Sequence, residues 1–287
     1  MGPYASHVYL VVAVLSAVFY GAADFLGGLT SKRADTIAVV LLSQFSGLVL
    51  VIAMLLFAPV ASYTRGDLLW GAAAGLTGGG GVAILYHALA TGTMAVVAPI
   101  TAVCAVLIPV GAALALGERP GVLTLAGIAL ALLAIVLLSR ATSAGQRRHY
   151  ARSVALALAS GIVIGLFFLC LARTSRDAGL WPLLVARSVS VPFFGVIALA
   201  GRRAIAIAPR VALLVIVGGA LDMLANLLYQ VAAHLGPLSV VVTLASLYPA
   251  STVILARVTL GERLTAAQAI GVACAMIAVV VIVGSTA

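Results

Sequence analysis

Charged side chains are scarce in this chain of 287 residues. Only 8% of the residues are Asp, Glu, Lys or Arg, and 64% are hydrophobic, whereas ordinary globular chains carry roughly 25% charged residues. A water-soluble fold of this length needs more polar surface than these side chains provide, so most of the outward-facing area must meet an apolar solvent. The composition excludes a water-soluble fold and indicates a protein embedded in the lipid bilayer.

The residue clusters that carry enzyme or nucleic-acid chemistry are also missing. The sequence has no zinc-ligand spacing, no Walker motif and no Ser/His/Asp cluster. The net charge is +9, but the 16 Lys and Arg residues are scattered between apolar stretches, so we expect no nucleic-acid partner. Cys104, Cys170 and Cys274 lie far apart in apolar sequence, which predicts buried thiols. We therefore expect no enzyme activity, no cofactor and no bound metal.

Long uncharged runs take up most of the chain. A helix needs about 20 residues to cross a hydrocarbon core of about 30 Å, and strands of a membrane barrel would be about 10 residues of alternating pattern. The runs are instead nearly continuous Ala, Val, Leu and Ile, which predicts an all-α integral membrane protein with ten transmembrane helices. The predicted spans are residues 8–29, 36–58, 67–90, 94–116, 121–139, 152–172, 181–200, 211–233, 238–260 and 265–284. The first span has no basic segment before it, so we expect it to remain as a membrane helix rather than a cleaved signal peptide.

The chain repeats itself at half its length. The run Leu-Gly-Glu-Arg at 116–119 recurs at 260–263, an offset of 144 residues. Identical pairs at the same offset include Ser16 with Ser160, Gly75 with Gly219 and Gly92 with Gly236. We predict two homologous halves of five helices each, residues 1–140 and 153–287, joined by a cytoplasmic loop of residues 141–152.

An odd number of helices in each half has a topological consequence. If the halves share a fold, the second must enter the membrane from the side opposite to the first, so the repeats are inverted. Inverted repeats make the inward-open and outward-open states near equivalents and place the substrate site close to the bilayer midplane, between the halves. The architecture is typical of a transporter.

Several motifs recur at matching places in the two halves. They are the prolines of the fourth and ninth spans (Pro99, Pro109, Pro249), the two Leu-Gly-Glu-Arg runs, and the glycines Gly127 and Gly271 of the last helices. The first helix adds an aromatic-Gly start, Phe19-Tyr20-Gly21. With these, the chain resembles the drug/metabolite transporter superfamily, specifically the ten-span exporters with duplicated EamA-type repeats. The resemblance covers essentially the whole chain and implies the fold and an export activity. It does not name the substrate, because members of this family move amino acids, purines, dyes and other metabolites.

Ionisable groups at membrane depth are rare and costly, so each is a candidate site. Asp222 falls about twelve residues into the span 211–233, and Asn226 and Tyr229 follow at i+4 and i+7 on the same helical face. This stripe suits a carboxylate that binds a proton or an amine beside groups that hydrogen-bond a substrate. The alternative is a polar seam that holds helices together.

Other polar residues of the spans leave two interpretations open. Asp24 lies one turn after Tyr20 and either lines the same cavity or pairs with the basic loop at 32–33. Arg187 either serves a structural role, by snorkelling to the interface or by pairing with another buried group such as Asp222, or binds a substrate carboxylate. We favour the structural role for Arg187.

The span 67–90 carries further candidates. His87 is the sixth predicted substrate-binding residue, after Asp222, Asn226, Tyr229, Tyr20 and Asp24, and its alternative is a surface residue near the span end. The four glycines at 78–81 permit either close helix approach or local unwinding. Outside this span, the intramembrane prolines predict bends in the fourth and ninth spans, and Glu118 and Glu262 are expected near the start of the following helix, where the dipole favours negative charge.

Lys and Arg predict the orientation. The loops on the side of the termini carry four of them and the loops on the other side carry eleven. Because cytoplasmic loops are enriched in Lys and Arg, both termini are predicted to be non-cytoplasmic, in the cell (cytoplasmic or inner) membrane.

The preferred function is a secondary active transporter, an exporter of small metabolites such as amino acids or related polar or amphipathic compounds, that works by alternating access. Proton coupling is a hypothesis that rests on Asp24 and Asp222. The alternative functions are an integral membrane enzyme or a lipid-carrier flippase-like protein that uses intramembrane carboxylates, and a subunit that scaffolds a larger complex. The sequence leaves monomer and homodimer open.

Overall fold

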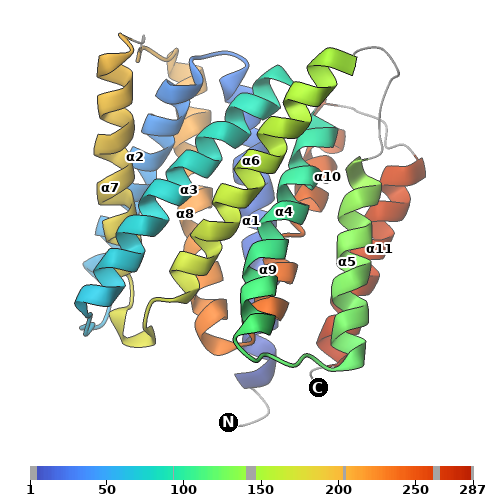
Figure 1. The fold of residues 1–287 in the computed structure, drawn as a ribbon. Helices are drawn as coiled ribbons and strands as arrows, with labels where there is room; N and C mark the ends of the chain where they lie inside the picture. The colour runs from blue at the N-terminus through green and yellow to red at the C-terminus, as the bar shows by residue number, and fades with distance from the viewer. Residues whose placement is uncertain (1–4, 93, 140–146, 203–204, 261–265, 286–287) are drawn as a thin grey trace.

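The described part of this computed structural model comprises residues 5–92, 94–139, 147–202, 205–260 and 266–285, and its regular secondary structure is entirely helical. Figure 1 shows the helices side by side and roughly along one axis. The helices are α1 (Ala5–Ser31), α2 (Thr36–Leu55), α3 (Arg65–Thr91), α4 (Met94–Ala115), α5 (Val122–Ser139), α6 (Arg147–Ala172), the short 3-10 helix η1 (Arg176–Ala178), α7 (Trp181–Ala200), α8 (Pro209–Leu235), α9 (Leu238–Ala245), α10 (Tyr248–Leu260) and α11 (Ala266–Ser285).

Six of these helices, α1, α2, α3, α6, α7 and α8, are long and apolar enough to cross a membrane by themselves. The others contain shorter apolar stretches over the described residues, such as Ile100–Ala115 in α4 and Val122–Ala134 in α5, and α9 and α10 together make the ninth crossing. Large apolar side chains point outward, for example Val11 (59% exposed), Leu69 (71%) and Val280 (69%), as expected for helices that face acyl chains. The predicted membrane fold is confirmed.

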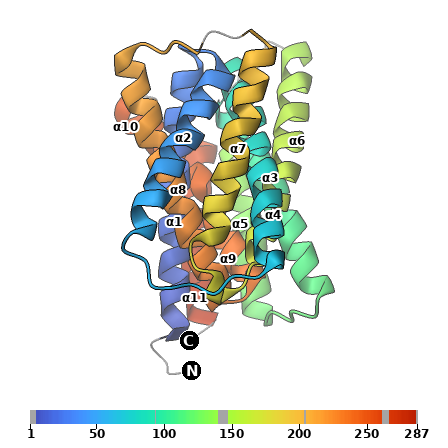
Figure 2. The ribbon, with the colours of Figure 1, turned by 90° about the vertical axis from the view of Figure 1, so that its left-hand side faces the viewer.

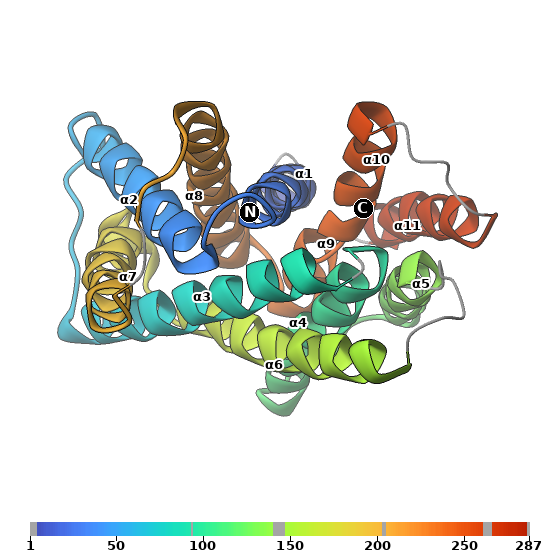
Figure 3. The same cartoon turned by 90° about the horizontal axis from the view of Figure 1, so that it is seen from above.

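The two halves run in opposite directions. In Figure 1, α1 begins at the lower end of the bundle and its equivalent α6 begins at the upper end, so the two repeats are inverted. Both termini lie at the lower end, as Figure 2 also shows. Packing follows the same symmetry, because α1 packs on α8 and α6 packs on α3, while α5 packs on its own equivalent, α11. Figure 3, seen along the bundle, shows the pairs α3–α6 and α5–α11 side by side.

Individual hydrogen bonds are also repeated between the two halves. The hydroxyl of Ser16 donates to the carbonyl of Ala225 at 3.0 Å, and the hydroxyl of Ser160 donates to the carbonyl of Gly81 at 2.9 Å. Both the donors and the acceptors are related by the offset of 144 residues. The internal duplication therefore preserves individual contacts between the halves, in addition to the order of the helices.

Glycines let helices approach closely around the centre of the bundle. A Cβ at Gly75 would collide with the backbone of Ala186 on α7, and a Cβ at the equivalent Gly219 would collide with the backbone of Ser43 on α2. The four glycines at 78–81 lie within the unbroken helix α3 and face α6 and α7. Of the two interpretations of this run, the structure shows close helix approach.

The ninth crossing is interrupted near its middle. Helix α9 ends at Ala245 and α10 begins at Tyr248, which places Pro249 in the first turn of α10. A proline is tolerated there because the first backbone N–H groups of a helix have no partner within it. The bend predicted for the ninth span is confirmed, while α4 remains one helix through Pro109.

Candidate functional site

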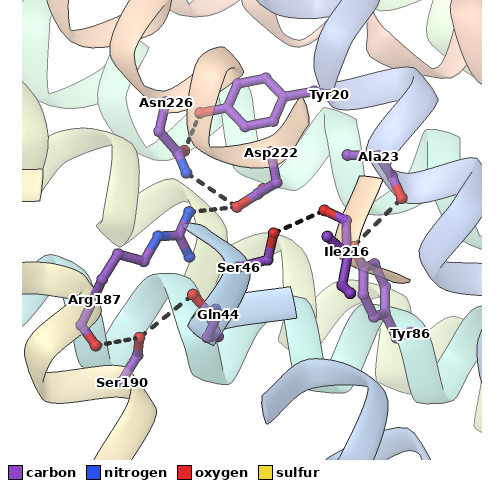
Figure 4. Close-up of polar contacts among 10 residues, drawn as sticks. All are labelled: Tyr20, Ala23, Gln44, Ser46, Tyr86, Arg187, Ser190, Ile216, Asp222 and Asn226. Atoms are coloured by element: carbon purple, nitrogen blue, oxygen red, sulfur yellow. Dashed lines mark hydrogen bonds and ion pairs between the residues drawn. The ribbon is translucent and has the colours of Figure 1, made fainter. Parts of the chain in front are cut away.

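A small cavity lies among α1, α2, α3, α6, α7 and α8, beside the start of α10. It has a volume of about 40 Å³, which is enough to hold ordered water. Figure 4 shows part of this polar lining, namely Tyr20, Gln44, Arg187, Ser190, Asp222 and Asn226. The polar residues of its lining are Tyr20, Asp24, Gln44, Arg187, Ser190, Asp222, Asn226 and Tyr248.

A chain of hydrogen bonds joins three helices at this cavity. The guanidinium of Arg187 on α7 donates to the carboxylate of Asp222 on α8 at 2.5 Å. Asn226 lies one turn after Asp222; its amide donates to the same carboxylate oxygen at 3.1 Å, and its carbonyl oxygen accepts from the hydroxyl of Tyr20 on α1 at 2.6 Å. Arg187 thus makes a buried ion pair instead of snorkelling to the interface, and the charge of Asp222 is balanced by a fixed cation.

Asp24 has a different environment. It is 6% exposed and lines the cavity, so of its two interpretations the structure shows the cavity position. No cation among the residues that the structure describes lies within ion-pair distance of its carboxyl group. Because a buried carboxylate without a cation is costly, this position calls for a proton or a cationic ligand.

Aromatic rings make the apolar part of the wall. The ring of Tyr20 contacts those of Phe168 and Tyr248 edge to face, with centroids 5.7 and 6.5 Å apart. The hydroxyl of Tyr248 is buried and has no hydrogen-bond partner within the described ranges. A buried hydroxyl of this kind is rare in folded proteins unless water or a ligand satisfies it.

Two of the predicted substrate-binding residues lie elsewhere. Tyr229 is fully buried with its hydroxyl donating to the carbonyl of Phe168 at 3.0 Å, so it ties α8 to α6. His87 is half-buried, and its carbonyl accepts from the hydroxyl of Thr91 at 2.7 Å. Neither belongs to the lining that the structure describes, whereas Tyr20, Asp24, Asp222 and Asn226 do.

Three polar residues of the lining escaped the sequence analysis. Gln44 on α2 and Ser190 on α7 face each other, with the hydroxyl of Ser190 donating to the amide oxygen of Gln44 at 3.4 Å. Gln44 is an amide within a predicted span, which was a usable signal. Tyr248 stands directly before Pro249, at the break of the ninth crossing, and lines the cavity.

A polar cavity enclosed by inverted halves is the arrangement expected of a carrier. Comparison with known proteins identifies the family of the chain. Residues 7–140 and 151–284 each match the model of the EamA-like transporter family. The chain belongs to the EamA-like transporter family. It is therefore a multi-pass membrane transporter of small molecules in the drug/metabolite transporter superfamily, and not an enzyme. The second matched stretch begins and ends 144 residues after the first, so this match has the same offset as the internal repeat.

Solved structures show the same fold. A total of 27 chains of solved structures match. One of them, the crystal structure of a protein, superposes with a TM-score of 0.75. The superposition covers 98% of this chain and 96% of the other at 18% sequence identity. A search of curated proteins finds no match.

Proposed function

We propose that this EamA-family protein is a secondary active exporter of small polar or amphipathic metabolites, and that the cavity at Asp222 is its substrate site. The observation that carries the proposal is the buried network of Tyr20, Asn226, Asp222 and Arg187. Tyr20 belongs to the first half of the chain and the other three to the second, so the network bridges the two units whose relative movement would open the cavity to either side.

The interrupted ninth crossing supports alternating access. Tyr248 is the first residue of α10 and lines the cavity, so a change of angle between α9 and α10 would change the cavity wall directly. Breaks in helices beside a central site are a recurring feature of secondary transporters. In this proposal, the break converts occupancy of the cavity into movement of one half against the other.

Asp24 is the proposed proton-coupling group. Asp222 already has a cationic partner in Arg187, whereas Asp24 has none among the described residues. Closing the cavity around an unpaired carboxylate is costly unless a proton or a cationic ligand accompanies it. A proton that binds Asp24 from one side of the membrane and leaves it on the other side would couple the proton gradient to export.

The proposal is tested in proteoliposomes with an imposed proton gradient. Accumulation from a defined mixture of amino acids and biogenic amines is followed by mass spectrometry for the wild type, Asp24→Asn and Asp222→Asn. Both variants are expected to abolish gradient-driven accumulation, and the control Asp177→Asn, which changes an exposed acid outside the cavity, is expected to retain it. Unchanged accumulation in the two cavity variants would contradict proton coupling through these carboxylates and would favour a uniporter. No accumulation by the wild type would contradict the transport proposal for these compounds.

The orientation belongs to the same proposal. The excess of Lys and Arg on the loops opposite to the termini supports a protein of the cytoplasmic membrane with both ends outside the cytoplasm.

A further inference from the structure

The charges that line the central cavity do not sum to zero. Three side chains of the described lining carry a formal charge: Asp24, Asp222 and Arg187. Arg187 and Asp222 form an ion pair, which leaves the carboxyl group of Asp24. With Asp24 ionised, the cavity carries one negative charge that a ligand or a proton must balance.

Arg187 has no unbalanced positive charge left for an anionic ligand. Its guanidinium is bound to Asp222, and the residue is only 6% exposed. Its other side packs against Gly47 on α2, where even a single added Cβ would lie 3.0 Å from its Nε atom. A substrate carboxylate on the remaining N–H groups of Arg187 would share its one positive charge with Asp222, and the cavity would then hold more negative charge than the guanidinium balances.

The unsatisfied groups point to the opposite ligand charge. The hydroxyl of Tyr248 is buried without a partner in the described chain, and Tyr248 lines the same cavity as Asp24. Hydroxyl and carboxylate oxygens both accept hydrogen bonds from an ammonium group, which carries three donors. The rings of Tyr20 and Phe168 in the same lining add electron-rich faces that attract cations.

We propose that the substrate of this cavity is an organic monocation, a protonated amine on an apolar body, whose ammonium group binds between Asp24 and the Tyr248 hydroxyl. This inference rests on the proposed transport function and names its substrate class. The cavity of about 40 Å³ accommodates the ammonium end, and the apolar body lies against the aromatic wall when the cavity widens. Proton and amine then compete for one carboxylate, so binding of either releases the other, which is the exchange that a proton-coupled exporter requires.

Three probes with one skeleton and different charges test the inference. Phenethylamine is a cation at pH 7, phenylalanine is a zwitterion and 3-phenylpropionate is an anion. Binding is measured as the shift in thermal unfolding of the purified protein, because a ligand of the folded state raises the melting temperature. We expect phenethylamine to raise it, and the other two probes to do so only at concentrations about tenfold higher or more.

Two variants localise the effect. Asp24→Asn is expected to weaken phenethylamine binding by roughly thirtyfold or more, the loss typical of a buried charge pair. Tyr248→Phe is expected to weaken it less and to leave the fold intact, since the hydroxyl that it removes has no partner in the described chain. It therefore tests the site even if Asp24→Asn fails to fold, and Asp177→Asn is the matched control.

The outcomes separate this inference from the transport function. Equal or stronger binding of phenylalanine or 3-phenylpropionate, or no shift with phenethylamine, would overturn the cation inference and leave transport of other compounds unaffected. Binding of phenethylamine that needs Asp24, without counterflow of phenethylamine in proteoliposomes, would support the binding site and contradict its role in transport.

Discussion

The carboxylate of Glu118 accepts a hydrogen bond from the backbone N–H of Leu238 at 2.8 Å. Its second oxygen accepts from the N–H of Ser239 at 3.1 Å. Glu118 follows α4 in the first half, and Leu238 begins α9 in the second, so one side chain caps a helix of the opposite repeat. The sequence predicted that Glu118 would stabilise the start of the following helix, and the structure corrects this: the helix that it caps is α9, whose free N–H groups and dipole attract the carboxylate.

Removing this cap should loosen the attachment of α9. Glu118→Ala leaves two N–H groups of α9 unpaired, and we expect a loss of about 1–2 kcal/mol in the free energy of unfolding, as for other helix caps. Thermal unfolding in detergent measures the effect. Arg119→Ala is the control, because it changes the exposed neighbouring residue; an equal loss in both variants would show that the loop matters and the cap does not.

The ion pair between Arg187 and Asp222 predicts a larger loss of stability for a single change than for the double change. Arg187→Leu leaves Asp222 buried without its cation, which should cost about 3–5 kcal/mol. In the double variant Arg187→Leu/Asp222→Asn no charge of the pair remains, and most of the loss should be recovered. A double-mutant cycle on the unfolding free energies measures this coupling, and simple additivity of the two losses would contradict a direct pair.

Close approach of helices at the centre is tested at a glycine. Gly219→Ala would bring a methyl group into the backbone of Ser43, and we expect a loss of about 1–3 kcal/mol as α2 and α8 are pushed apart. Gly195→Ala is a matched control on α7, because nothing lies within 4 Å of the added Cβ. It should be neutral or stabilise by up to about 1 kcal/mol through helix propensity. Equal melting temperatures for the two variants would show that Gly219 is not at a tight contact.

Two tyrosines that the sequence predicts to bind substrate, Tyr20 and Tyr229, should respond differently to substitution. Tyr229→Phe removes the bond to Phe168 and is expected to cost about 1 kcal/mol of stability without changing transport affinity. Tyr20→Phe removes a bond within the cavity network and is expected to change the apparent affinity for substrate. His87→Ala should leave affinity unchanged. Concentration-dependent uptake in proteoliposomes measures the affinity of all three variants. A raised half-saturation concentration for Tyr229→Phe or His87→Ala would show that the substituted residue does contribute to substrate binding.

Orientation has a direct test. A reporter that works only in the cytoplasm, fused after Ala287, is expected to remain inactive because the Lys and Arg asymmetry predicts both termini outside. The same reporter inserted into the predicted cytoplasmic loop 141–152 should be active. The reverse pattern would contradict the predicted orientation.

The sequence by itself determined the solvent, the number of crossings and the duplication. Lipid follows from 8% charged residues, because a bilayer accepts a span only if nearly every side chain is apolar, and this requirement can be read from composition. The inverted halves follow from an offset of 144 residues and an odd number of helices in each. Both inferences depend on composition, on comparison of the sequence with itself and on counting, and they need no knowledge of which helix faces which.

Only the tertiary structure decided which polar groups meet. Arg187 and Asp222 are 35 residues apart, and Glu118 and Leu238 are 120 apart. Whether such residues meet depends on how each helix is rotated about its own axis and on its neighbours. In lipid, the outward and inward faces of a helix are almost equally apolar, so hydropathy leaves that rotation undetermined. Close glycine contacts and buried hydrogen bonds fix it, and they exist only once the helices have packed.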